Sequence, residues 1–254
     1  MALSAELLSV NLYTGLASPL IGSAIAAGTA RWIAGKSWGF EASCCSACGR
    51  RLRALEMVPI VSWAALGGAC RGCAAPISPH YPLVELAAVG VALWAWLATP
   101  PQVFAVTCVF GWLLLALSVI DIRTRRLPDP LNLALAATGL VAAAFLAPER
   151  ILDHAAGCVV GFASLVAIEI AYRKLRGRDG IGRGDAKLLA AIGAWVGIHG
   201  LAECIFVASA SGIAWLLLLR NLTSRQISSD TAVSFGPFLA LGGWLTWLYG
   251  PLAF

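Results

Sequence analysis

The chain has 254 residues, of which 59% are hydrophobic and only 12% are charged. This composition and a mean hydropathy of +0.82 exclude an ordinary soluble domain and indicate a protein embedded in a lipid bilayer. The formal net charge of +5 is not interpreted as a nucleic-acid-binding surface, because membrane proteins concentrate Lys and Arg in their cytoplasmic loops.

Uncharged apolar stretches predict an all-α, polytopic integral membrane protein with about eight transmembrane helices. A helix needs about 20 apolar residues to cross a bilayer. The stretch 86–120 exceeds one crossing, and Pro100 and Pro101 within it predict a turn between two helices. The predicted helices lie in residues 7–30, 86–98, 103–120, 131–148, 155–168, 188–202, 205–219 and 231–254.

The distribution of basic residues predicts the orientation of these helices. No Lys or Arg precedes the first apolar segment, so we expect a permanent helix rather than a cleaved secretory signal. If the N-terminus lies outside the cytoplasm, only Arg150 of the eighteen Lys and Arg residues falls on the outer side. The chain then divides into a first transmembrane helix at 1–34, a cytoplasmic loop at 35–82 and a helical membrane domain at 83–254.

The loop at 35–82 carries two CxxC pairs, Cys45 with Cys48 and Cys70 with Cys73. Paired CxxC knuckles of this spacing predict a structural zinc ion held by four thiolates. Two disulfides are the alternative, but a cytoplasmic loop lies in a reducing compartment where disulfides rarely persist. Cys44 could replace Cys45 as a ligand. Four sulfur ligands would leave the metal no open position for substrate, so it would hold the loop together.

Acidic residues in or beside apolar segments are candidates for function, because placing an ionisable group there is costly. Asp129 precedes a proline and an apolar run, so we interpret it as a helix N-cap. Asp121 ends an apolar run, at the unfavourable end of a helix dipole, where no capping role explains it. An ion pair with a nearby arginine is the alternative there. The full set of candidate acids is Glu85, Asp121, Asp129, Glu169 and Asp185.

Asp185 directly precedes a predicted helix and could be an ordinary N-cap. Gly182 and Gly184, however, would let another backbone approach its carboxylate closely. Hydrolysis of an amide by carboxylates needs one ionised aspartate to activate water and one protonated aspartate to assist the carbonyl and the leaving group. Since Asp121 and Asp185 both lie at cytoplasmic helix ends, we predict that they form such a pair. The sequence leaves open which of them is protonated.

The residues around both aspartates resemble the bacterial type 4 prepilin peptidases, which are membrane aspartic proteases of the GxGD type. Ile120–Ile122 with Leu127–Asp129 is similar to the first aspartate motif of that family, and residues 182–189, GRGDAKLL, are similar to its GxGDxKL motif. The resemblance runs from about residue 22 to residue 243. Further matches are Val58-Pro59, Ser62-Trp63, the two CxxC pairs, Ile77–Glu85 and Phe235–Phe238.

The resemblance implies cleavage of the basic leader of prepilins and pseudopilins of type IV pili and type II secretion, after a glycine, at the cytoplasmic face of the bacterial inner membrane. By position, Asp121 and Asp185 match the catalytic pair. The resemblance gives supporting or substrate-contacting roles to Gly182, Gly184, Lys187 and Glu85. It implies prepilin-type substrates and leaves the oligomeric state open, and the distribution of Lys and Arg predicts a periplasmic N-terminus.

Many members of this family also methylate the new N-terminus with S-adenosylmethionine, an activity linked to the N-terminal half. The present chain reads Gly22-Ser23-Ala24-Ile25 where the family usually has a GSFLNV-like run with an asparagine. S-adenosylmethionine is therefore expected as a cofactor only if the methyltransferase activity is retained. Glu85 either serves that site or caps the second membrane helix.

Two other functions fit parts of the sequence. A small transporter with a zinc-stabilised loop would use intramembrane acids as ion sites, but it predicts acids near the middle of the bilayer. A related membrane aspartic protease with another substrate would share the same fold and site.

Overall fold

The computed structural model describes residues 2–35, 43–177, 182–223 and 234–250. The described residues form helices, without a strand among them. Six of these helices are long and apolar enough to cross a membrane: α1, α3, α4, α5, α6 and α7. The predicted all-α, multi-spanning membrane fold is therefore confirmed. The chain divides into two compact units, residues 1–112 and 113–254, and the long helix α4 contributes to both.

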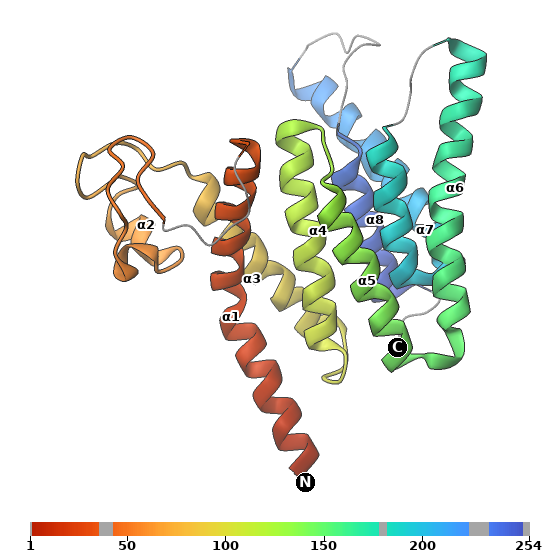
Figure 1. The fold of residues 1–254 in the computed structure, drawn as a ribbon, viewed down its shortest axis with the longest axis horizontal. Coiled ribbons are helices and arrows are strands. Elements are labelled where there is room, and N and C mark those ends of the chain that lie inside the picture. The colour runs from red at the N-terminus through yellow and green to blue at the C-terminus, as the bar shows by residue number, and fades with distance from the viewer. Residues whose placement is uncertain (1, 36–42, 178–181, 224–233, 251–254) are drawn as a thin grey trace. The chain divides into compact units, whose positions relative to one another are not determined.

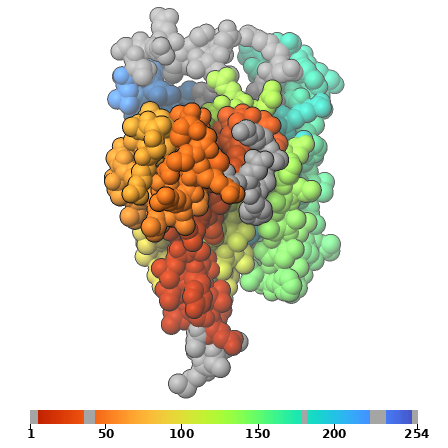
Figure 2. All heavy atoms as spheres, turned by 60° about the vertical axis from the view of Figure 1, so that its left-hand side comes forward, coloured from red at the N-terminus to blue at the C-terminus, as the bar shows by residue number. Residues whose placement is uncertain are grey.

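The first unit contains α1 (Ala2–Ile33), the short helices η1 (Ala54–Met57) and α2 (Val61–Ala65), α3 (His80–Ala98) and the start of α4 (Phe104–Thr124). Gly22 lets α1 and α3 pack closely, since a Cβ at this position would lie 2.6 Å from the Glu85 Cα. The predicted turn after α3 is present, and the buried Asn11 amide donates to the Pro101 carbonyl at 2.8 Å. Between α1 and α3, the cysteine loop forms a compact lobe, drawn in orange in Figure 2.

The second unit contains the rest of α4, α5 (Asp129–Leu146), η2 (Pro148–Arg150), α6 (Ile151–Arg176), α7 (Arg183–Thr223) and α8 (Gly236–Tyr249). Its core is formed where α6 and α8 pack against α7. The ribbon of α7 starts and ends at the same end of this unit (Figure 1).

Helix α7 reverses its direction at Gly197, whose φ of 67° and ψ of 180° are not helical. Neighbouring glycines of α8 contact both arms of α7: a Cβ at Gly243 would meet the Ile192 side chain, and one at Gly242 would overlap the Cys204 carbonyl. In a continuous helix, residues 192 and 204 would lie about 18 Å apart along the axis. Because two adjacent residues of α8 contact both residue 192 and residue 204, α7 must consist of two antiparallel arms that meet at Gly197.

The two arms of α7, together with the five other long helices and α8, give the eight helical segments that hydropathy predicts. The break between the predicted helices 188–202 and 205–219 is nevertheless misplaced, since it falls at Gly197. That prediction followed the charged residue Glu203, whereas the reversal needs a positive φ that glycine adopts without strain. Parts of the predicted last helix, 231–233 and 251–254, lie outside the described residues. The predicted division at residues 34 and 82 stays a prediction.

The close packing of α6 on α7 gives a stability prediction. A Cβ at Gly157 would lie 2.5 Å from the Gly193 carbonyl oxygen, a backbone atom that cannot move aside cheaply. We expect Gly157→Ala to destabilise the protein by about 1–3 kcal/mol through overpacking. The control is Gly90→Ala in α3, where a Cβ meets nothing within 4 Å. Thermal unfolding in detergent should show a lower Tm for Gly157→Ala only, and equal Tm values for both variants would contradict this packing.

Candidate active site and metal centre

Asp121 lies in the last turn of α4 and is buried, with 4% of its surface exposed. Its Oδ2 accepts a hydrogen bond of 3.1 Å from the Gly236 amide at the start of α8. A Cβ at residue 236 would lie 2.6 Å from that oxygen, so only glycine lets the backbone come this close. Among the described residues, no ion pair joins Asp121 to a neighbouring arginine, so the ion-pair alternative is not supported.

Asp185 is the third residue of α7, so it does not occupy the N-cap position. Its side chain is half-buried, and its carboxylate lies within electrostatic range of Asp121. Both glycines of the motif have close neighbours on the side where a Cβ would lie. A Cβ at Gly182 would contact Asp185 Oδ2 at 3.5 Å, and one at Gly184 would contact the Leu127 side chain at 3.4 Å. The structure thus places both predicted aspartates at one end of the second unit, within electrostatic range of each other.

Asp129 and Lys187 connect the two motifs. The Lys187 ammonium donates to Asp129 Oδ1 at 2.6 Å, which joins the start of α5 to the start of α7. The interpretation of Asp129 as an N-cap is wrong, because it is the first helical residue after Pro128 and makes no capping hydrogen bond. Local sequence could not show this, since the partner of Asp129 is 58 residues away.

Glu169 of α6 is buried beside the segment that carries Asp185. Its carboxylate lies 3.7 Å from Arg183 Nε and 3.9 Å from Arg173 Nη1. Two arginines therefore satisfy this buried charge, and one of them starts α7 two residues before Asp185.

Glu85 is buried on α3, where its Oε2 accepts a hydrogen bond of 2.7 Å from the Ile60 amide. It is the sixth residue of α3, whose N-cap is Pro79, so the interpretation as a helix cap is wrong. Ile60 has a φ of 62°, a left-handed conformation that a β-branched residue rarely adopts. The Glu85 contact therefore holds a strained turn of the cysteine loop against α3.

The four predicted cysteines form the group that could hold a metal ion. The sulfur atoms of Cys45, Cys48, Cys70 and Cys73 all lie within 4.8 Å of one another, and Cys45 and Cys73 are 3.8 Å apart. Zinc–thiolate bonds of about 2.3 Å in a tetrahedron require sulfur–sulfur distances of about 3.8 Å. The donor set thus fits such an ion, and it includes Cys45 rather than Cys44. No disulfide joins the cysteines, all of which the structure describes.

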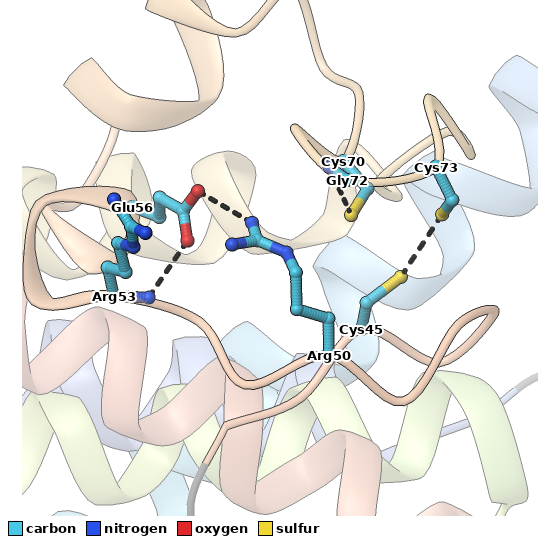
Figure 3. A network of polar contacts seen from close by, with 7 residues as sticks. All are labelled: Cys45, Arg50, Arg53, Glu56, Cys70, Gly72 and Cys73. Atoms are coloured by element: carbon cyan, nitrogen blue, oxygen red, sulfur yellow. Dashed lines mark hydrogen bonds and ion pairs between the residues drawn. The ribbon is translucent and has the colours of Figure 1, made fainter.

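Backbone amides of the knuckles favour the thiolate form that a metal requires. The Gly72 amide donates to Cys70 Sγ at 3.4 Å and, with the Cys73 amide, lowers the pKa of Cys70 to about 6. The amides of Cys48 and Ala47 likewise lower the pKa of Cys45. Figure 3 shows that Arg50 and Glu56 lie beside this cluster, a contact that no motif in the sequence predicts.

Comparison with known proteins identifies the family. Residues 108–217 match the type IV leader peptidase family, and residues 16–99 match the bacterial peptidase A24 N-terminal domain. A prepilin leader peptidase/N-methyltransferase of Dichelobacter nodosus is 39% identical over 211 residues, which cover 82% of this chain and 71% of that protein. The chain belongs to the type IV leader peptidase family.

Other relatives of this peptidase carry the same name. The protein of Pseudomonas aeruginosa is 38% identical over 215 residues, covering 82% of this chain and 71% of the relative. The protein of Burkholderia pseudomallei is 40% identical over 210 residues, covering 82% and 67%. No solved structure matches the chain. The resemblance inferred from the motifs is thus confirmed, and the chain is an enzyme.

The cysteine cluster gives a prediction of the metal content of the purified protein. We expect one ion per chain and loss of that ion in Cys45→Ser, because the variant keeps only three thiolates of the cluster. Cys44→Ser is the matched control and should keep the full metal content, since Cys44 is outside the cluster. Elemental analysis of the purified variants measures this. Loss of metal in Cys44→Ser with retention in Cys45→Ser would contradict the ligand set.

Proposed function

We propose that this peptidase removes the basic leader of prepilins or pseudopilins, cleaving after a glycine at the cytoplasmic face of the inner membrane. The observation that carries the proposal is the convergence of Asp121 and Asp185 at one end of the second unit, in a chain of the leader peptidase family. Family membership and the helix-end positions of both acids favour this function over a transporter.

In the proposed reaction, Asp121 and Asp185 divide the work of amide hydrolysis. The ionised carboxylate takes a proton from a water molecule as the water attacks the scissile carbonyl. The protonated carboxyl donates to the carbonyl oxygen, and a proton is then delivered to the leaving nitrogen. The Gly236 amide fixes the orientation of the Asp121 carboxyl through Oδ2.

Gly182 leaves room for an extended substrate beside Asp185. It presents no side chain next to the Asp185 carboxylate, so a substrate backbone can approach there, whereas Gly184 lies against the Leu127 side chain. The Lys187 ammonium is bound to Asp129 and so holds α7 to α5. We therefore assign Lys187 a supporting role rather than a catalytic one.

We propose zinc as the ion of the cysteine cluster, with Cys45, Cys48, Cys70 and Cys73 as its ligands. A zinc ion with four sulfur ligands supplies structural cross-linking and has no open position for a substrate. The ion would stabilise the folded conformation of the loop, and the hydrogen bond from the Ile60 amide to Glu85 would hold that loop to α3.

N-methylation of the cleaved product is a second proposed activity. The relatives are named as leader peptidases and N-methyltransferases, and the first unit of this chain matches the bacterial N-terminal domain of the family. S-adenosylmethionine would be the methyl donor. Gly22, which precedes the altered run, packs against Glu85 where α1 meets α3.

The proposed orientation places the N-terminus in the periplasm and the active site on the cytoplasmic side. In support, Asp121 lies in the last turn of α4 and Asp185 in the first turn of α7. Both have arginines nearby in the sequence, as expected at the cytoplasmic border.

Amide substitution tests the aspartate pair. We expect Asp121→Asn and Asp185→Asn each to lower the cleavage rate of a purified prepilin at least about 100-fold, because each removes a proton-transfer group. The control, Asp153→Asn, removes a carboxylate that pairs with His199 and should cleave normally. Cleavage is followed by mass spectrometry of the product. A normal rate in either active-site variant would contradict the proposal.

Adding S-adenosylmethionine to the same assay tests the second activity. We expect the cleaved prepilin to become heavier by one methylene group, and Asp185→Asn to methylate a supplied pre-cleaved pilin at the wild-type rate. An unmodified cleaved product across the pilins of the host would remove methylation from the function and leave the peptidase assignment intact.

A further inference from the structure

Arg50 belongs to the first cysteine knuckle through its backbone. Its carbonyl accepts a hydrogen bond of 2.9 Å from the Cys45 amide, and the Gly49 amide donates to the Cys45 carbonyl at 2.9 Å. These contacts close the turn that carries Cys45 and Cys48. Arg50 is therefore fixed to one half of the proposed metal centre.

The side chain of Arg50 reaches the other half of the centre. A Cβ at Gly72 would lie 2.8 Å from Arg50 Nε and 3.0 Å from Arg50 Cδ, so the side chain crosses directly over the second knuckle. Its guanidinium interacts electrostatically with Cys70, the ligand that also accepts from the Gly72 amide. Arg50 thus connects the two knuckles, which lie more than twenty residues apart in the sequence.

Glu56 holds the guanidinium in this position. Its Oε1 accepts from Arg50 Nη2 at 2.6 Å, its Oε2 accepts from the Arg53 amide at 2.8 Å, and its side chain is only 5% exposed (Figure 3). Both carboxylate oxygens are therefore engaged. The arginine fork has a remaining donor, since the buried Nε–H has no nitrogen or oxygen acceptor among the described residues.

The cysteine sulfurs of the cluster are suitable acceptors for the Arg50 Nε–H. Four thiolates around a divalent ion leave a net negative charge on the sulfurs. Groups that donate to such ligands orient them and tune the metal, and their loss typically costs about 10–100-fold in metal affinity. A guanidinium beside Cys70 is suited to this role, because it is always charged and its donors lie in a rigid plane.

We propose that Arg50, positioned by Glu56, is a positioning residue of the metal centre that docks the second knuckle onto the first and orients Cys70. This inference rests on the proposed metal ion and is independent of the peptidase chemistry. The arginine is not a ligand. It acts on the metal through Cys70 and on the loop through the two knuckles.

Metal release from the purified full-length enzyme tests the inference. We expect Arg50→Gln to bind one ion per chain but to release it to a chelator at least about 10-fold faster than the wild type. Glu56→Gln, which frees the guanidinium without removing it, should release metal at an intermediate rate. The matched control is Arg51→Gln, which neutralises the neighbouring exposed arginine and should behave as the wild type.

A spectroscopic readout separates this role from a general loosening of the loop. In cobalt-substituted enzyme, loss of a donor to Cys70 should move the sulfur-to-metal charge-transfer band of Arg50→Gln to lower energy, and Arg51→Gln should leave it unchanged. A wild-type release rate and an unmoved band in Arg50→Gln would overturn the inference. If Arg50→Gln does not fold, a wild-type rate in Glu56→Gln overturns it instead. Absence of metal from the wild-type enzyme would overturn the proposed metal centre itself, without bearing on the aspartate pair.

Discussion

The backbones of α6, α7 and α8 approach each other so closely that side chains at the crossing points would not fit. Gly157 and Gly193 face each other between α6 and α7, and Gly242 lies against the Cys204 carbonyl between α8 and α7. Helix pairs in membranes commonly associate through such small residues, because lipid gives no hydrophobic force to drive helices together. This packing fixes the two arms of α7 on both sides of α8. The start of α7, with Asp185, and the start of α8, with Gly236, therefore lie at one end of the unit.

The same constraint extends to the candidate active site. Gly236 brings a backbone amide to Asp121 at a distance that any side chain would prevent. Asp121 is thereby held by an element more than a hundred residues later in the chain. The cysteine lobe is organised differently. Its two knuckles meet at the cluster of four cysteine sulfurs, and the Arg50–Glu56 ion pair lies beside that cluster. One unit is thus defined by helix packing and the other includes a polar loop that a metal ion would hold together.

Much of this architecture is predictable because its causes are local or set by the bilayer. Apolar stretch length predicts the helices, and the spacing of the cysteines predicts their clustering. The reversal of α7 is not predictable from charge, because Gly197 is one of several nearby glycines and only its tertiary packing selects it. The contacts of Asp129 and Glu85 are not predictable from local sequence for a related reason. Their partners, Lys187 and the Ile60 amide, are separated from them by 58 and 25 residues. The family resemblance adds the substrate class, which no physical pattern in the chain reveals.

The central claim is that Asp121 and Asp185 act as a single catalytic unit. The most direct measurement compares the residual prepilin cleavage rates of Asp121→Asn, Asp185→Asn and the double variant. Residues that act together show strongly non-additive losses. The account predicts that the double variant is no slower than the slower single variant. Losses that multiply in the double variant would show that the two aspartates act independently and would contradict the account.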